Sequence, residues 1–194
     1  RSAFLFGDGG VAALVERDEK FGKSYFSLNS DGSRADLIMI KGGGYRHPSS
    51  EETLREKVVD EYGNIRSDEQ GYMQGGDVFN FVIREIPRDI KKTLEYAGDT
   101  ADSFDYIVFH QANNFINAYI AKKMKLDTDK IPSTIAKYGN TSSVSVPLTI
   151  VSELKDRLYG NKKLLLSAFG VGMTWATGIV PFVDCKIQTL AALY

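Results

Sequence analysis

Hydrophobic residues recur every three to four positions after Asp77, and this spacing predicts an amphipathic helix. We expect the helix to end at Gly98, and Pro87 to kink it or to mark a second helical start. Packing against a core is the simplest role for the apolar face. The residues of that face are Phe79, Val82, Ile83, Ile86, Ile90, Leu94 and Ala97.

The second half of the chain alternates apolar runs with helical patterns. The run 106–109 is typical of a short buried strand, and two closing strands are expected at 163–168 and 174–182. One intervening helix has Pro147 in its first turn and stops at Gly160. Its expected buried residues are Leu148, Val151 and Leu154; those of the helix after residue 109 are Phe115, Ile116, Tyr119, Ile120 and Met124.

The first half reads as short strands separated by turns. Apolar runs at 2–6 and 11–16 flank a Gly-Asp-Gly-Gly turn, and further strand-like pieces lie at 23–30 and 35–40. A phosphate-binding glycine loop is the weaker interpretation, because it requires a strand followed by a helix. Segment 41–50 is turn-forming, with His47 in a solvent-facing loop, and the charged segment that follows suits a mobile connector or lid. The order of elements indicates an α/β class.

Composition narrows the possible partners and the cellular location. The chain has 194 residues, 43% of them hydrophobic, and its 24 basic and 25 acidic residues nearly cancel. No bulk charge therefore attracts nucleic acid, and no apolar run is long enough to span a membrane. A single cysteine, Cys185, excludes an internal disulfide and fits a reducing cytoplasm. The start at Arg1, without methionine or a signal peptide, suggests a fragment.

Three segments carry groups that can stabilise an oxyanion: His-Gln-Ala-Asn at 110–113, Gly-Asn-Thr-Ser-Ser at 139–143, and the glycine-containing turn at 168–175. A histidine donates or shuttles a proton, an asparagine amide donates without titrating, and a glycine turn exposes backbone N–H groups. Each signal alone also has a structural interpretation: His110 as a satisfied structural residue, and Asn140 as a turn residue. Two histidines 63 positions apart (110 − 47) offer no metal-ligand spacing, so no metal site is expected.

Taken in order, these segments resemble β-ketoacyl-acyl carrier protein synthase III, a family of condensing enzymes in the thiolase superfamily. His-Gln-Ala-Asn is followed thirty residues on (140 − 110) by Gly-Asn-Thr-Ser-Ser, then by Ala-Phe-Gly-x-Gly-x-Thr-Trp. The opening Leu-Phe-Gly-Asp-Gly-Gly also matches a family segment. The resemblance covers nearly all of this chain but only the C-terminal part of the family's protein, and the part with the nucleophilic cysteine is missing.

The resemblance implies an α/β, thiolase-like layered αβαβα fold. The chain would comprise the C-terminal half of that fold with the last strands of the N-terminal half. Residues 1–45 would supply those closing strands, 46–74 a connector or lid, and 75–194 the C-terminal half-domain. An excised half should expose apolar surface where the other half packs, which favours dimers or poor solubility.

The resemblance also implies the roles of individual residues. His110 and Asn140 would stabilise the enolate formed when malonyl-acyl carrier protein loses carbon dioxide. The loop Gly170, Val171 and Gly172 would supply an oxyanion-hole N–H, most simply that of Val171. Phe169 would brace the loop, and Asn113 would lie near the pantetheine arm of the substrate. Nothing in the sequence around Cys185 favours that residue as the nucleophile.

Implied partners are acyl-coenzyme A, malonyl-acyl carrier protein and a second copy of the chain, with no cofactor beyond the thioester substrates. Lys122 and Lys123 match the family's basic, carrier-binding face, whereas Phe115 stands where an arginine is frequent. Related acyltransferases and polyketide or secondary-metabolite synthases share the His–Asn pair and remain alternatives. Thiolases and chain-elongating synthases have histidine at the position of Asn140, which argues against both. A non-enzymatic half-domain that acts as a binding module is the third possibility.

Overall fold

The computed structural model describes residues 4–15, 17, 19, 21–188 and 191, and these form two compact units. The first unit takes its described residues from Arg1–Asn29, Val82–Phe169 and Trp175–Tyr194. The second takes them from Ser30–Phe81 and Gly170–Thr174.

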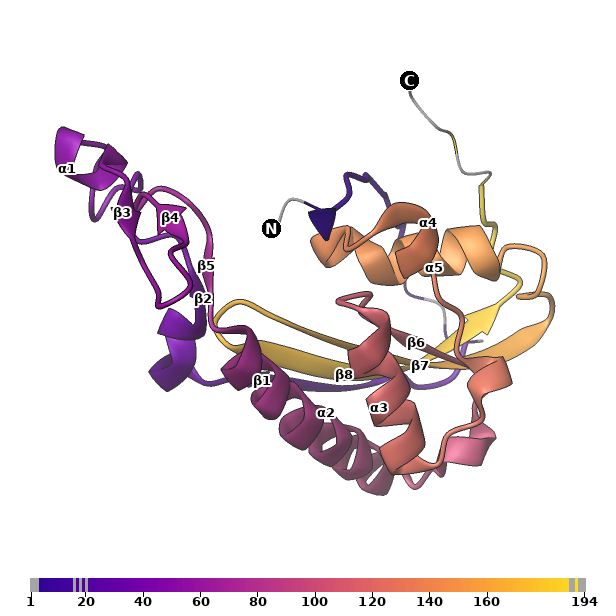
Figure 1. Cartoon of the computed structure of the whole chain (residues 1–194). Coiled ribbons are helices and arrows are strands. Elements are labelled where there is room, and N and C mark those ends of the chain that lie inside the picture. Colours follow the sequence, from indigo (N-terminus) through magenta and orange to yellow (C-terminus); the bar gives the residue numbers. More distant parts are fainter. Residues whose placement is uncertain (1–3, 16, 18, 20, 189–190, 192–194) are drawn as a thin grey trace. The chain divides into compact units, whose positions relative to one another are not determined.

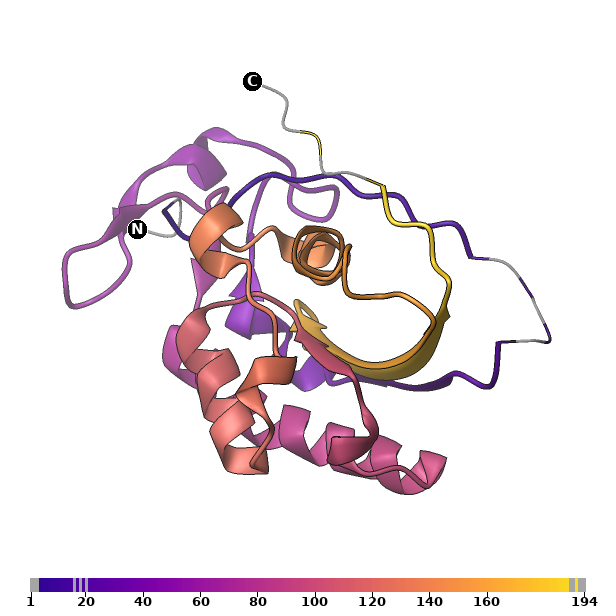
Figure 2. The same cartoon turned by 90° about the vertical axis from the view of Figure 1, so that its right-hand side faces the viewer.

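A four-stranded sheet forms the centre of the first unit, in the order β1 (Tyr25–Ser30), β8 (Thr174–Val183), β7 (Asn161–Gly170) and β6 (Tyr106–Phe109). Strands β6 and β7 run parallel, with Tyr106 opposite Leu164 and Phe109 opposite Ser167. Helices α2 (Gly75–Ala97) and α3 (Asn114–Met124) cover one face, and α5 (Ser145–Glu153) covers the other (Figures 1 and 2). Because a parallel pair needs a crossover, α3 and α5 lie between β6 and β7 in the chain.

The core beneath α5 is aliphatic. Helix α5 and the turn that follows it pack Ile150, Leu154 and Leu158 against Val108 of β6 and Leu164 of β7. All five side chains are buried, and full burial of each stabilises the fold by about 1.5–3 kcal/mol. This packing fixes the start of α5 near the end of β6, where His110 lies.

We expected Pro87 to kink the helix or to mark a second start. Helix α2 runs through Pro87 as one element, so the second start is wrong, and the kink stays a prediction. Its buried side chains confirm the predicted stripe at Val82, Ile86, Ile90 and Leu94. One charged residue, Asp89, is buried on the same helix. Its carboxylate accepts hydrogen bonds from Ser27 Oγ (2.5 Å), Asn29 Nδ2 (2.8 Å) and Thr177 Oγ1 (2.6 Å), which tie α2 to strands β1 and β8.

Strand β1 has an apolar face that is exposed within the first unit. Phe26 and Leu28 are 61% and 80% exposed, whereas Ser27 and Asn29, which alternate with them, bond to Asp89 on α2. Side chains of successive strand residues point to opposite faces of a sheet. Strand β1 therefore presents exposed apolar side chains on the face opposite α2, which is typical of a surface that packs against other protein.

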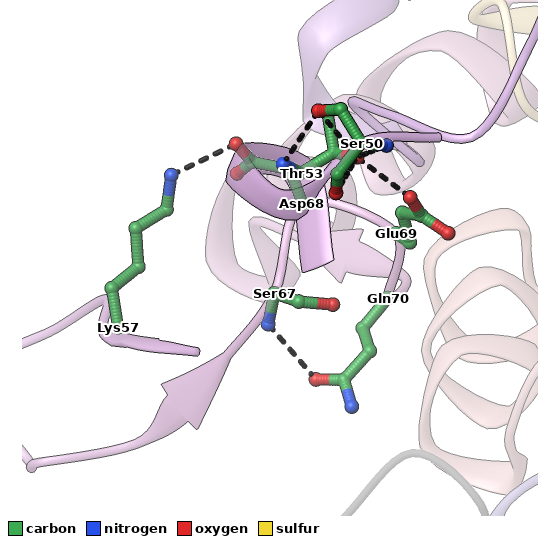
Figure 3. A network of polar contacts seen from close by, with 7 residues as sticks. All are labelled: Ser50, Thr53, Lys57, Ser67, Asp68, Glu69 and Gln70. Carbon is green, nitrogen blue, oxygen red and sulfur yellow. Dashed lines mark hydrogen bonds and ion pairs between the residues drawn. The ribbon is translucent and has the colours of Figure 1, made fainter. Parts of the chain in front are cut away.

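The second unit contains short elements. These are η2 (Gly32–Leu37), β2 (Ile38–Met39), α1 (Glu51–Leu54), β3 (Lys57–Val58), β4 (Ile65–Arg66) and β5 (Tyr72–Met73). Strand β2 pairs with β5, and β3 with β4, both antiparallel. Side chains reinforce these pairs: Thr53 donates to Glu69 at 2.7 Å, and Lys57 bonds to Asp68 at 2.8 Å (Figure 3). Segment 51–74 is charged and aperiodic in sequence but contains these short elements; its expected role as a mobile connector or lid stays a prediction.

Three strand expectations in the first half, at 2–6, 11–16 and 35–40, are wrong in whole or in part. Residues 11–15 form no strand, and Phe6 makes only an isolated parallel bridge to Asn140; residues 2, 3 and 16 lie outside the described part. A strand needs a neighbouring strand for its hydrogen bonds, and none in the described part lies beside 11–15. In 35–40, the Asp31 side chain accepts the N–H of Ser33 and starts the 3₁₀ helix η2, so only Ile38–Met39 remain extended.

Candidate active site

His110 lies directly after β6, at the carboxyl end of a buried parallel strand. Its N–H donates to the carbonyl oxygen of Ser167 at 2.8 Å, which extends the pairing with β7 by one residue. Its carbonyl oxygen accepts from Asn117 Nδ2 of α3 at 3.2 Å. The histidine backbone is therefore fixed by both the sheet and a helix, as a precisely placed side chain requires.

Two side chains from distant segments contact the His110 imidazole. Nδ1 lies 2.6 Å from the hydroxyl of Ser145, at the start of α5. The Phe169 ring, near the end of β7, stands edge-on to the imidazole, with centroids 5.2 Å apart and planes at 83°. A ring packed in this way restricts the rotamer of its neighbour. Phe169 thus contacts His110 directly, a contact that sequence reasoning did not predict.

Burial lowers the pKa of His110 from its ordinary value of 6.5 to about 4, and the nearby Ser142 backbone opposes this shift in part. Removal of water disfavours the charged imidazolium, because an ion loses more hydration free energy than a neutral ring. His110 is therefore neutral at pH 7. A neutral imidazole can donate a hydrogen bond from one nitrogen and accept at the other.

Asn140 is held in a tight loop by the N-terminal segment. Its N–H donates to the carbonyl oxygen of Leu5 at 2.8 Å, and its carbonyl accepts from Gly7 N–H at 3.1 Å. Gly139 precedes it with φ 68°, in the left-handed region that favours glycine. The Gly-Asn pairing in the sequence thus has a backbone reason, because a Cβ on Gly139 would also press on the Leu5 carbonyl.

The Asn140 side chain has a defined orientation. It is buried, and its Oδ1 accepts the N–H of Ser142 at 2.9 Å. The amide NH₂ donates to no group in the described part of the chain, so its hydrogens remain available to a ligand. Because the Ser142 backbone also interacts with His110, the predicted pair is linked through one loop, 140–145.

Other predicted site residues have structural contacts that bear on their roles. Asn113 is the N-cap of α3, where its side-chain oxygen accepts the N–H of Ile116 at 2.9 Å. Lys122 and Lys123 are both exposed, but Lys123 Nζ donates to the Ile83 carbonyl at 2.6 Å. Phe115 is 69% exposed, so its predicted place on the buried face of α3 is wrong; Asn117 and Ala121 are buried there instead.

The loop that contains Gly170, Val171 and Gly172 belongs to the second unit. Val171 is 62% exposed, and its carbonyl accepts from Thr174 Oγ1 at 2.9 Å. Gly172 has φ 142°, which favours glycine, and the Met173 backbone pairs with that of Asp31 in both directions. The turn is therefore locally fixed, and its oxyanion role stays a prediction.

Sequence reasoning missed two side chains that build this site. Ser145 is 1% exposed and contacts His110. In the sequence it follows Ser142 and Ser143, and serines just before a helix usually indicate only a helix cap. Gln111 is fully buried, and its Oε1 accepts from Ser133 Oγ and the Thr134 N–H, both at 3.1 Å. Periodicity within α5 could have suggested burial of Ser145, but only tertiary contacts identify its partner.

Cys185 is exposed, as its place after the last strand suggests. No cluster of three or more histidine, cysteine or acidic side chains suited to a metal occurs in the described residues. Within the same part of the chain, no helix has the length and apolar character needed to cross a bilayer.

Comparison with known proteins relates this geometry to a family. Residues 94–182 match the C-terminal domain of 3-oxoacyl-[acyl-carrier-protein] synthase III. β-Ketoacyl-[acyl-carrier-protein] synthase III of several Streptococcus pneumoniae strains is 34% identical over 183 residues, covering 92% of this chain and 52% of the relative. The chain thus spans about half the length of the curated relatives it matches.

Solved structures agree with the sequence match. A 3-oxoacyl-(acyl-carrier protein) synthase from Burkholderia xenovorans superposes with a TM-score of 0.75 at 34% identity, over 87% of this chain and 47% of its own. The synthase III from Thermus thermophilus gives 0.77 at 28% identity, over 95% and 54%. The α/β, thiolase-like fold is confirmed, and the chain belongs to the β-ketoacyl-[acyl-carrier-protein] synthase III family, to whose C-terminal part it corresponds.

Proposed function

We propose that this chain supplies the enolate-stabilising half of a 3-oxoacyl-[acyl-carrier-protein] synthase III active site. The observation that carries the proposal is that a neutral, largely buried His110 and an Asn140 with an NH₂ unbonded in the described residues are joined through one loop. Two neutral donors stabilise developing negative charge without competing for a proton. The parent protein would catalyse decarboxylative Claisen condensation of an acyl-coenzyme A starter with malonyl-acyl carrier protein.

The chemistry assigns each group a step. A cysteine thiolate attacks the thioester carbonyl of the acyl-coenzyme A, the bond to the coenzyme A sulfur breaks, and the coenzyme A thiolate leaves. The malonyl carbon–carbon bond then breaks, carbon dioxide leaves, and the electron pair moves into an enolate whose oxygen accepts from His110 and Asn140. The enolate carbon attacks the acyl-cysteine carbonyl, a carbon–carbon bond forms, and the cysteine thiolate leaves. The proposal places that cysteine in the part of the relatives that this chain does not match.

The same proposal includes the partners. Acyl-coenzyme A and malonyl-acyl carrier protein are the substrates, and the thioester groups make a resident cofactor unnecessary. Asn113 contacts the pantetheine arm of the substrate. The loop Gly170–Gly172 donates to the tetrahedral oxyanion, and Phe169 holds the His110 imidazole in place. The protein works as a cytoplasmic homodimer. The exposed apolar side chains Phe26 and Leu28 support the packing of this chain against further protein surface.

The direct test separates acylation from condensation. The parent protein is incubated with a panel of acyl-coenzyme A donors, and acyl-enzyme is detected by mass spectrometry. His110→Ala and Asn140→Ala should retain acylation but lose about 100- to 1,000-fold in malonyl decarboxylation, the usual effect of removing an oxyanion donor. His47→Ala, at an exposed loop position, is the control. Full decarboxylation by both site variants would contradict the proposal.

A second candidate is a relative that uses coenzyme A thioesters directly as extender. Phe115 favours it, because an exposed aromatic side chain stands where the family frequently has a carrier-binding arginine. Condensation rates with malonyl-coenzyme A and with malonyl-acyl carrier protein distinguish the two. A kcat/KM for the coenzyme A substrate equal to or above that for the carrier substrate would favour the second candidate.

A further inference from the structure

The Ser145 hydroxyl makes two polar contacts in the described part of the chain, and both involve the His110 region. Its Oγ lies 2.6 Å from His110 Nδ1 and accepts the backbone N–H of Gln111 at 3.2 Å. The residue is 1% exposed, so bulk water does not complete its hydrogen bonds. Its backbone is fixed as well, because its carbonyl accepts from Thr149 Oγ1 at 2.8 Å within α5.

A count of donors and acceptors orients this hydroxyl. A serine hydroxyl has one hydrogen to donate and two lone pairs to accept. The Gln111 N–H occupies one lone pair and cannot accept the hydrogen. His110 Nδ1 is the remaining contact, so donation by Nδ1 would leave the serine hydrogen without an acceptor. An unsatisfied buried donor is costly enough to decide between two tautomers of similar intrinsic stability.

We propose that Ser145 is a positioning residue that donates its hydroxyl hydrogen to Nδ1 of His110 and thereby keeps the imidazole hydrogen on Nε2. The fixed backbone of Ser145 and the edge-on contact of Phe169 hold the two side chains in this arrangement. Nε2 then carries the one donor hydrogen of the neutral ring. The tautomer follows from the hydrogen bonds alone, whereas its use on an enolate oxygen rests on the proposed function.

The tautomer can be measured without any activity assay. In the full chain carrying His47→Gln, only His110 contributes imidazole signals, and long-range proton–nitrogen NMR reports which nitrogen holds the hydrogen. We expect a pyridine-like Nδ1 and a pyrrole-like Nε2 at pH 7. Ser145→Ala should give a mixture of tautomers, and Ser145→Thr, which keeps the hydroxyl, should restore Nε2–H. Ser143→Ala, at an exposed serine of the same loop, should change nothing.

In the parent protein, Ser145→Ala should lower kcat for condensation by about 10- to 1,000-fold with little change in KM, as loss of the correct tautomer does elsewhere. A hydrogen on Nδ1 in the unmodified chain would overturn the proposal, whether or not the variants fold. Pure Nε2–H in Ser145→Ala would overturn it equally. The expected tautomers without any condensation by unmodified parent protein would support the role of Ser145 and reject the proposed function instead.

Discussion

Gly7 donates its backbone N–H to the carbonyl oxygen of Asn140 at 3.1 Å, so a residue near the start of the chain fixes the loop of the predicted site. The contact is close enough that a Cβ on Gly7 would overlap the Tyr138 carbonyl oxygen. In the glycine-rich segment 7–10, which resembles a phosphate loop by composition, Gly7 therefore has a steric role against the Asn140 loop.

Gly7→Ala should destabilise the chain by about 1–3 kcal/mol, the usual cost of forcing an extra group into a packed site. The clashing atom belongs to the backbone, which cannot move aside without breaking the loop. Gly10→Ala is the matched control, since a Cβ there meets nothing within 4 Å. Thermal unfolding followed by circular dichroism compares the two, and equal melting temperatures would contradict this role of Gly7.

Acid should destabilise the fold through His110. Its pKa is about 4 in the folded chain and about 6.5 when unfolded, so the unfolded state binds the proton more readily. The contribution to stability is fully present above pH 6.5 and is lost as the pH falls from there to about 4, a total of about 3 kcal/mol. Carboxyl groups with lowered pKa, such as Asp105, contribute below that window.

Urea unfolding between pH 4 and pH 7 measures this dependence. His110→Asn should flatten the curve in that window, whereas His47→Gln should leave its slope unchanged. An unmodified chain whose free energy of unfolding is constant from pH 7 to pH 4 would show that His110 is not buried in its neutral form.

Asp89→Asn should lower the free energy of unfolding by about 1–3 kcal/mol. The Asp89 carboxylate accepts hydrogen bonds from Ser27, Asn29 and Thr177. In the asparagine variant, an NH₂ group replaces one carboxylate oxygen and cannot accept a hydrogen bond from these donors. Asp102→Asn makes the same chemical change at an exposed position and should have little effect. Chemical denaturation at pH 7 provides the comparison, and similar losses in both variants would rule out a special role for the buried network.

Lys122 should contribute more than Lys123 to the binding of a carrier-linked substrate. Both are exposed, but Lys123 already donates to the Ile83 carbonyl and lies over the Tyr119 ring. We expect Lys122→Ala to raise KM for malonyl-acyl carrier protein about two- to fivefold, within the usual worth of one exposed charge pair. The effect should shrink at high salt. A larger effect of Lys123→Ala at low salt would reverse this assignment.

Local sequence patterns determined the elements whose signals lie within a few residues of one another. The stripe of α2, the apolar strand β6 and the hairpin strands β7 and β8 follow from spacing and composition. The spacing of His110 and Asn140, with the glycine turn after Phe169, was also sufficient to indicate the family. The division of the chain at residues 45 and 75 stays a prediction.

Tertiary structure alone decided which groups meet. The side chain of Ser145, rather than those of the neighbouring serines, contacts His110 from 35 residues away. Asp89 accepts from donors 60 to 88 residues distant. The segment 11–15 has strand-like composition but no strand beside it in the described part, so it stays irregular. The physical reason is common to these cases: periodicity is set by near neighbours, whereas a hydrogen-bond partner is set by where the folded backbone brings distant groups.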